Sequence, residues 1–188
     1  LWPSTDRPGG ESSTEEIVAA YAHRALLPPQ VWREILLACK DTVDLLGFAM
    51  LHLPEQEPDL MAILKTKAEG GCQVRVALAD PESSQAEDRD AEERLDKGLL
   101  ARIKTSRIYF SELEGCPGVE IRLHSTPMYN SIFRFDDQML VTPHLFGIPG
   151  SKAPLFHIRR RGPTGIFNNF ASHFEAIWQS SQPAKETG

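Results

Sequence analysis

The sequence has few cysteines and lacks the short motifs that mark common catalytic and metal sites. Cys39, Cys72 and Cys116 lie far apart and form no C-x-x-C pair, which favours a reducing compartment over a disulfide framework. The six histidines include no pair at metal-ligand spacing on one helix face. We find no G-x-G-x-x-G, Walker, H-E-x-x-H or G-x-S-x-G pattern. The sequence therefore predicts neither a metal site nor a bound cofactor.

Positive charge and long apolar runs are scarce as well. The formal net charge is −6 and the isoelectric point is about 5.5, whereas a protein that holds nucleic acid needs a basic face to neutralise phosphates. No apolar run reaches membrane-spanning length, and no signal peptide opens the chain. We expect a cytoplasmic protein that does not span a membrane and does not itself hold nucleic acid.

The sequence does have enough apolar residues for one core. Hydrophobic residues make up 41% of its 188 positions, which is typical of a single domain. Residues 1–12 are rich in Pro, Gly and Ser and are predicted to be a linker. We assign residues 13–182 to the domain and residues 183–188 to a disordered tail. Because the chain starts with Leu1 rather than Met, we expect it to be a fragment of a longer protein.

Apolar spacing predicts alternating helices and strands. A capping-box pattern, Ser13-x-x-Glu16, predicts a first helix with Ile17, Tyr21 and Ala25 on its apolar face. Two strands joined by a helix form a βαβ unit, so the predicted fold class is α/β, with a single mixed β-sheet flanked by helices. Further helices are expected after Pro28-Pro29, at about 58–69, over 83–103 and from Thr164 onward, and strands at 43–51, 73–79, 119–124, 131–136, 138–142 and 154–159.

The segment YNSIFRFDDQML, residues 129–140, predicts a tight β-hairpin that turns at Asp136 and Asp137. It also lies where a phosphoryl-transfer motif, His-x-Lys-x4-Asp, would fit. Here the His position is Tyr129, the Lys position is Ser131, and only Asp136 agrees with the motif.

The order of elements around this hairpin resembles a single phospholipase D-like domain. In that superfamily the His of the motif is the covalent nucleophile, the Lys binds phosphate, and a Gly-Ser pair follows the Asp. The Gly-Ser position falls at about Pro143-His144 in this sequence. The resemblance implies a phospholipase D-like fold, and the missing His and Lys imply a catalytically inactive site.

A closer resemblance covers nearly the whole chain. The segments LWP, YAHRALLPPQVW, VRVALADP, IRLHSTPMYNSIFRFDDQMLVTPHLFG and FEAIW are similar to actinobacterial transcription regulators. In those proteins a phospholipase D-like domain follows an XRE-type helix-turn-helix. The resemblance implies an effector-sensing and dimerisation domain that forms a homodimer and reaches DNA only through a domain absent from this chain. Two alternatives stay open: a phosphodiesterase or nuclease with a rebuilt phospholipase D-like site, and an oligomerisation module without ligand.

Ligands of open α/β sheets bind at the carboxyl ends of the strands, so the polar residues near such ends form the candidate site. Arg122, His124 and Arg134 offer charge-assisted hydrogen bonds to an anion. We expect a small effector, phosphorylated or not, in a cavity lined together by His124, Tyr129 and Ser131. The predicted ligand-binding residues are Arg122, His124, Tyr129, Ser131, Arg134, Asp136 and His144, with Asp80 and Ser125 as further polar candidates.

Structural roles remain open for several of these residues. Arg122 and Arg134 alternate with apolar neighbours, which is equally compatible with a solvent-facing or interface position. Asp136 has the residue type and position of an ordinary turn residue.

Overall fold

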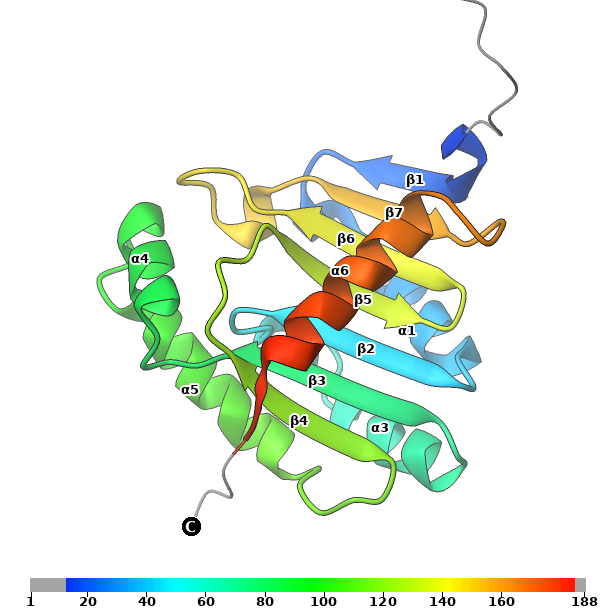
Figure 1. The fold of residues 1–188 in the computed structure, drawn as a ribbon, viewed down its shortest axis with the longest axis horizontal. Coiled ribbons are helices and arrows are strands. Elements are labelled where there is room, and N and C mark those ends of the chain that lie inside the picture. The colour runs from blue at the N-terminus through cyan, green and yellow to red at the C-terminus, as the bar shows by residue number, and fades with distance from the viewer. Residues whose placement is uncertain (1–12, 185–188) are drawn as a thin grey trace, which may run out of the picture.

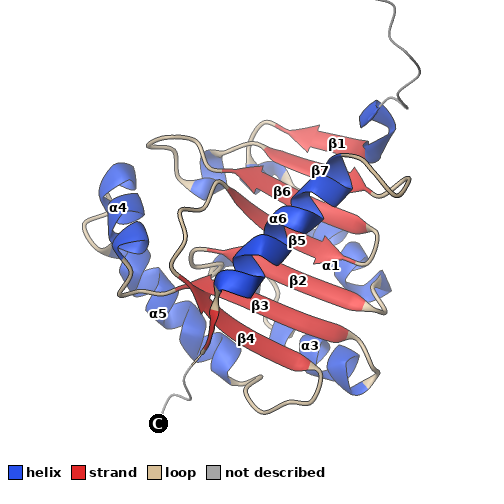
Figure 2. Ribbon diagram, viewed as in Figure 1, coloured by secondary structure: helices blue, strands red, loops and turns tan. Residues whose placement is uncertain are grey.

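The backbone forms one eight-stranded mixed sheet with helices on both of its faces (Figure 1, Figure 2). The computed structural model describes residues 13–184. The predicted linker at 1–12 and residues 185–188 of the predicted tail lie outside this described range. The predicted α/β class with a single mixed sheet is confirmed.

The elements follow one another with short connections. The strands are β1 (Ile17–Tyr21), β2 (Thr42–Gly47), β3 (Gln73–Ala79), β4 (Val119–His124), β5 (Asn130–Phe135), β6 (Gln138–Pro143), β7 (Leu155–Arg159) and β8 (Gln182–Pro183). The helices are α1 (Pro29–Ala38), α2 (His52–Gln56), α3 (Leu60–Glu69), α4 (Ser84–Glu93), α5 (Gly98–Ser111) and α6 (Ile166–Ser180). Three short 3-10 turns are η1 (Ser13–Glu16), η2 (Arg24–Leu26) and η3 (Gly150–Lys152).

The sheet has a parallel half and an antiparallel half that meet at β2. The strand order is β1-β7-β6-β5-β2-β3-β4-β8. Strands β2, β3 and β4 run parallel, whereas β5, β6, β7 and β1 continue the sheet as an antiparallel series. From Val43 to Gly47, β2 is buried throughout, which explains why Asp44 is the one charged residue in an otherwise apolar stretch.

Helices cover the two faces separately. Helix α6 crosses one face, while α1 and α3 lie against the other (Figure 1). Buried Phe167, Phe174 and Trp178 of α6 pack in one apolar cluster, and buried Trp32 and Leu36 of α1 belong to the other. The sheet therefore separates two apolar cores, as layered domains of this class require.

The predicted hairpin is confirmed. Strands β5 and β6 are joined by the two residues Asp136 and Asp137, and Phe135 pairs with Gln138 next to the turn. Asp136 has a left-handed φ of 52°, a conformation that Asp tolerates better than most residues.

The predicted first helix is wrong. Residues Ser13–Glu16 form only a 3-10 turn, and Ile17–Tyr21 form the edge strand β1, antiparallel to β7. The Glu16 carboxylate accepts hydrogen bonds from the backbone N–H groups of Ile166 and Phe167 and so caps α6 instead of a helix of its own. The β-branched residues Ile17 and Val18 favour a strand, and this strand forms because it can pair with β7.

The single helix predicted over 83–103 is two helices, α4 and α5. Three non-glycine residues within 94–97 have left-handed φ angles and break the helix there. Asp90 of α4 accepts hydrogen bonds from the backbone N–H groups of Lys97 and Leu99 at 2.6 and 2.7 Å. A carboxylate from α4 thus caps α5. The break between the two helices is not visible in the sequence, because the apolar spacing continues across it.

Two strand boundaries also differ from the prediction. The strand predicted at 43–51 ends at Gly47, because the chain leaves the sheet there and Met50 adopts a left-handed φ of 58°. The short strand β8 pairs with β4 and includes Pro183, the first residue of the predicted tail.

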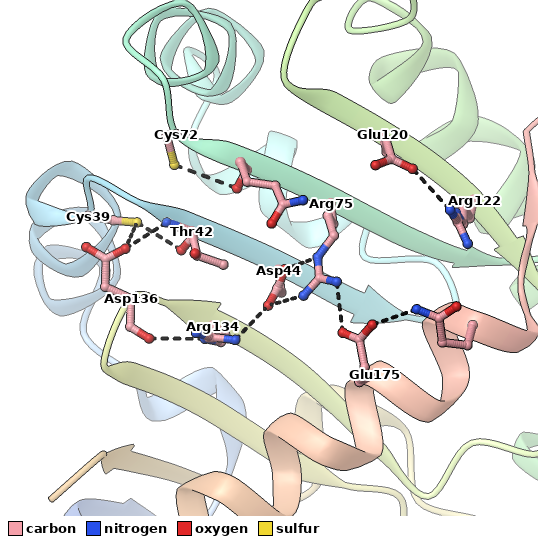
Figure 3. Close-up of polar contacts among 12 residues, drawn as sticks. Cys39, Thr42, Asp44, Cys72, Arg75, Glu120, Arg122, Arg134, Asp136 and Glu175 are labelled. Carbon is pink, nitrogen blue, oxygen red and sulfur yellow. Dashed lines mark hydrogen bonds and ion pairs between the residues drawn. The ribbon is translucent and has the colours of Figure 1, made fainter. Parts of the chain in front are cut away.

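A row of charged residues crosses the sheet beneath α6 (Figure 3). The strand register places Asp44 of β2 opposite Arg75 of β3 on one side and Arg134 of β5 on the other. Arg75 Nε donates to Asp44 Oδ1 at 2.7 Å, and Arg134 Nη1 donates to Asp44 Oδ2 at 3.3 Å. Arg75 Nη1 also donates to Glu175 of α6 at 2.9 Å. The row therefore ties α6 to the centre of the sheet.

We expect replacement of the fully buried Asp44 to destabilise the fold strongly. In Asp44→Ala the two arginines lose their shared carboxylate, so the free energy of unfolding should fall by about 3–5 kcal/mol, measured by urea denaturation at pH 7. Glu120→Ala is the control, because Glu120 continues the same row but is 54% exposed and, within residues 13–184, forms an ion pair with Arg122 alone. Its loss should lower the same free energy by at most about 1 kcal/mol. Equal losses in the two variants would contradict this account.

Candidate functional site

A cavity of about 340 Å³ lies at the carboxyl end of β2. Its walls come from the turn after β2, α2, the ends of α4 and α5 that face each other, the start of β5, the loop after β6 and the η2 turn. This is the edge at which open α/β sheets bind ligands. The polar lining residues are Arg24, His52, Glu55, Glu93, Arg102, Ser131, His144 and Ser151.

Ser131 and His144 form a hydrogen-bonded pair in this cavity. The distance from Ser131 Oγ to His144 Nε2 is 2.9 Å, and the distance from His144 Nδ1 to the carbonyl oxygen of Met128 is 3.3 Å. Burial lowers the pKa of His144 to about 4, and the Arg89 cation adds to this shift. The ring is therefore neutral near pH 7. A carbonyl can only accept, so Nδ1 carries the proton and Nε2 accepts from the Ser131 hydroxyl.

The backbone that follows β2 approaches this pair closely. A Cβ added at Gly47 would lie 2.5 Å from Met50 Cγ and 3.6 Å from Ser131 Oγ. Met50 itself has a left-handed φ of 58°, which is a strained conformation for this residue. Because position 47 has no side chain and Met50 adopts this conformation, residues 48–51 can turn back and line the cavity.

Two arginines give the cavity a positive wall. Burial lowers the pKa of Arg24 to about 10; the charge of Glu93 opposes this shift and the nearby Arg102 cation adds to it. Among the described residues the Arg24 guanidinium has no hydrogen bond or ion pair, although it packs against η3. The Glu93 carboxylate pairs instead with Arg89 at 2.6 Å. Among the described residues neither Arg24 nor Arg102 forms a hydrogen bond or ion pair through its guanidinium, although the charge of Glu93 attracts both and Glu55 also lines the cavity.

Arg89 fixes the loop that forms one side of the cavity. Its guanidinium donates to the carbonyl oxygens of Leu145 and Ile148 at 3.3 and 2.9 Å. The neighbouring Glu92 accepts from the backbone N–H of Gly147 at 2.8 Å. Because Arg89 is buried and multiply bonded, this loop is held to α4 rather than left free in solvent.

Two further histidines lie near the end of β2, and only His52 of the two lines the cavity. His124 is buried, and its Nε2 lies 3.3 Å from the carbonyl oxygen of Gly47. His52 lines the cavity, and its ring packs against Phe133 with 5.8 Å between ring centroids. Burial, and then the Arg24 cation, lower the pKa of His52 well below its ordinary value. His52 is therefore neutral at pH 7.

Of the predicted site residues, the structure brings Ser131 and His144 together in the cavity. The expectation that His124, Tyr129 and Ser131 line one cavity is wrong. His124 lies behind the turn after β2, and Tyr129 is 68% exposed. Tyr129 precedes the first residue of β5, so the two-residue strand period does not hold it on the face of Ser131.

The other predicted residues lie away from this cavity and have structural contacts. Arg134 belongs to the ionic row, and Arg122 lies 4.4 Å from the Trp178 ring and donates to the Trp178 carbonyl oxygen at 3.1 Å. Asp136 accepts hydrogen bonds from three backbone N–H groups at 2.8–2.9 Å and from Cys39 Sγ at 3.3 Å. Figure 3 shows Cys39 and Thr42 beside this carboxylate. Burial opposes ionisation, yet the three backbone donors lower the pKa of Asp136. The backbone donors are Lys40, Asp41 and Thr42.

The two remaining polar candidates are also outside the cavity lining. Asp80 Oδ1 accepts from the backbone N–H of Glu82 at 3.0 Å, in the turn that leads into α4. Ser125 is exposed after β4.

Sequence reasoning missed Arg24, His52, Glu93 and Arg102. Each lies on a different turn or helix, so local periodicity gives no reason to group them. The rule that ligands bind at carboxyl ends of strands points only to His52, which follows β2.

Residues 14–185 match a protein family described as "Domain of unknown function (DUF5919)". The chain belongs to the DUF5919 family. A search of curated protein sequences finds no significant match.

Several solved structures are similar to this DUF5919 domain. TrmBL2, an archaeal chromatin protein whose structure shows a novel mode of DNA binding, matches with a TM-score of 0.57 and 14% identity over 90% of this chain and 55% of that one. Nuc, a phospholipase D family member from Salmonella typhimurium, matches with a TM-score of 0.47 and 12% identity over 83% of this chain and 90% of that one. Phosphatidylserine synthase from Haemophilus influenzae Rd KW20 matches with a TM-score of 0.48 and 16% identity over 83% of this chain and 36% of that one.

The likeness to TrmBL2 concerns the fold alone, and the DUF5919 chain spans about half the length of that protein. Within residues 13–184 no helix has the length and apolarity needed to cross a membrane. The same residues contain no cluster of three or more His, Cys, Asp or Glu side chains suited to a metal ion.

The buried His124 should make the fold sensitive to acid. Burial lowers its pKa to about 4, from an ordinary value of 6.5, although the hydrogen bond to Gly47 and the charge of Asp80 partly oppose this. Between these values the unfolded chain binds a proton that the folded chain does not. The free energy of unfolding should therefore decrease as pH falls from 6.5 to 4, by about 3 kcal/mol for this group.

Urea denaturation between pH 7 and pH 4 tests this dependence. His124→Gln retains a donor for the Gly47 carbonyl and removes the titrating group, so its stability should decline less steeply than that of the wild type. A variant that folds at pH 7 and shows the wild-type slope would contradict the expectation.

Proposed function

We propose that this DUF5919 domain is the effector-binding and dimerisation domain of a cytoplasmic transcription regulator, and that a small anion binds in the cavity at the end of β2. The observation that carries the proposal is the Arg24 guanidinium, which is partly buried and repelled by Arg102. The charge of Glu93 attracts it, but among the described residues no side chain forms a hydrogen bond or ion pair with it. An anion between the two arginines would relieve both the desolvation and the repulsion.

The other polar groups of the cavity support an anionic ligand of small size. Glu93 forms its ion pair with Arg89, which Glu92 shares, so it attracts Arg24 and Arg102 without forming a hydrogen bond or ion pair with either of them. Ser151 and the neutral His52 add uncharged hydrogen-bonding groups. Planar guanidinium groups bind phosphates and carboxylates through paired N–H donors, and a hydrogen bond to a charged group contributes about 1.5–3 kcal/mol.

The place of the domain in a regulator is supported by two further observations. A protein of similar fold, TrmBL2, is described as DNA-binding, and this chain spans only about half of it. The formal charge of −6 agrees with DNA contacts that are made by a different domain. The sequence resemblance to helix-turn-helix regulators supports the same arrangement.

Ligand binding can be tested with thermal shifts in the presence of inorganic phosphate and small phosphate monoesters. A ligand at a hundred times its dissociation constant stabilises the folded state by about 2.7 kcal/mol, which raises the melting temperature. Arg24→Gln should abolish most of this response, because it removes one of the two cations between which the anion is proposed to bind. Arg107→Gln, on the same helix as Arg102 but outside the cavity lining, is the control and should respond like the wild type. Equal responses in both variants would contradict the proposed site.

A second candidate function, hydrolysis, is favoured by the Ser131–His144 pair. A hydroxyl that donates to a neutral imidazole, whose other nitrogen donates to a carbonyl, has the arrangement of a nucleophile and its base. Against this, a histidine with a pKa of about 4 is a weak base at neutral pH. Tyr129 and Ser131, at the His and Lys positions of the phospholipase D motif, also provide neither its imidazole nucleophile nor its cation.

We therefore expect no turnover of bis(4-nitrophenyl) phosphate or 4-nitrophenyl acetate above the buffer rate. Release of nitrophenolate measures it directly. Turnover that Ser131→Ala removes would establish the second candidate, whereas turnover that only Tyr129→Phe removes would point to a rebuilt phospholipase D-like site.

The proposed homodimer has a suitable apolar surface beside the cavity. Phe146 is 88% exposed in the loop after β6, and the exposed Tyr129 is joined to this loop through the backbone bond from His144 N–H to the Tyr129 carbonyl oxygen. We expect sedimentation to show a dimer at tens of micromolar and Phe146→Ser to shift it towards monomer. Ile108→Ser removes a comparably exposed residue from α5 and should leave the dimer intact. A wild-type monomer at this concentration would contradict the assignment.

A further inference from the structure

A second cavity of about 120 Å³ adjoins the one described above. The two share Arg24, His52 and Ser151 as lining residues, so these side chains form a common boundary. Most other residues of the smaller cavity are apolar: Leu27, Trp32, Leu53, Phe133, Leu140 and Leu155. A polar compartment and an apolar compartment thus lie side by side.

The apolar compartment has rigid aromatic walls. Trp32 meets Phe133 and Phe135 edge to face, with ring centroids 5.8 and 5.1 Å apart. Its volume is comparable to that of an apolar protein cavity of about 150 Å³ that binds benzene. The buried indole N–H of Trp32 has no hydrogen-bond partner within residues 13–184, which is unfavourable unless another molecule accepts from it.

The residues shared by the two cavities include one charged and one neutral side chain. Arg24 is a cation that lines both cavities, whereas His52 is neutral and packs its ring on Phe133. A substituent of an anion held by Arg24 can pass the neutral ring of His52 into the smaller cavity, whose lining residues other than Arg24 carry no charge.

We infer that the ligand of this domain is an anion that carries an aromatic or branched aliphatic group, with the anionic part in the larger cavity and the apolar part in the smaller one. This inference rests on the proposed function, because it needs an anion at Arg24. It adds that recognition depends on the substituent as well as on the charge.

Methyl phosphate and phenyl phosphate test the inference, since both are phosphate monoesters and differ in the apolar group. Titration calorimetry on the whole chain should give a dissociation constant for phenyl phosphate about 10- to 100-fold lower than for methyl phosphate, as burial of a phenyl-sized group predicts. Equal affinities would overturn the inference and leave the proposed anion site standing. Failure of both compounds to bind would overturn the proposed function as well.

Variants that fill the smaller cavity from its rim provide the matched comparison. Ala25 is exposed, Gln56 is exposed, and both line only this cavity. Ala25→Leu and Gln56→Phe should each remove most of the preference for phenyl phosphate and change methyl phosphate binding less than twofold. Ala101→Leu, exposed on α5 and outside both linings, is the control and should keep the preference. A full preference in both rim variants would show that the phenyl group binds elsewhere.

Discussion

The buried Asp44 carboxylate at the centre of the sheet constrains everything packed around it. A carboxylate without water or partners is highly unfavourable, so the neighbouring strands must each supply a cation at the same register position. Arg75 and Arg134 do so. Arg75 then reaches Glu175 and lies 4.8 Å from the ring of Phe174, which fixes α6 on the sheet. One buried charge thereby links the register of three strands to the position of a helix.

The same constraint determines which arginines are free to take part in the proposed anion site. Arg134 neutralises Asp44, and Arg122 is held by Trp178, so the arginines of the sheet that were candidates for anion binding maintain the fold instead. The cations of the cavity come from outside the sheet, from Arg24 in η2 and Arg102 in α5. The sheet contributes mainly the neutral Ser131 at the start of β5. Charge is therefore brought to the strand ends by turns and helices.

Local signals in the sequence were enough for much of the fold. The apolar run of β2 and the Asp136–Asp137 turn each specify their structure through neighbouring residues, and both were predicted. The helix predicted from Glu16 is wrong because its carboxylate accepts a hydrogen bond from the start of α6, far along the chain. The break between α4 and α5 was missed because the apolar spacing continues across it, while Asp90 caps α5. The site was predicted only in part for a related reason. Ser131 and His144 can be found from the sequence because both occupy positions of the phospholipase D motif. Arg24 lies far from them in sequence and reaches the cavity only after β1 pairs with β7 and η2 packs against the loop before β7.

The central claim is that Arg24 and Arg102 hold an anion at the carboxyl end of β2. Nuclear magnetic resonance of the arginine Nε–Hε groups measures this directly during a titration with inorganic phosphate. The account predicts saturable shifts of the Arg24 and Arg102 signals with one common dissociation constant, while Arg107 stays unchanged. Signals of Arg24 and Arg102 that do not move, or that drift without saturation together with Arg107, would contradict it.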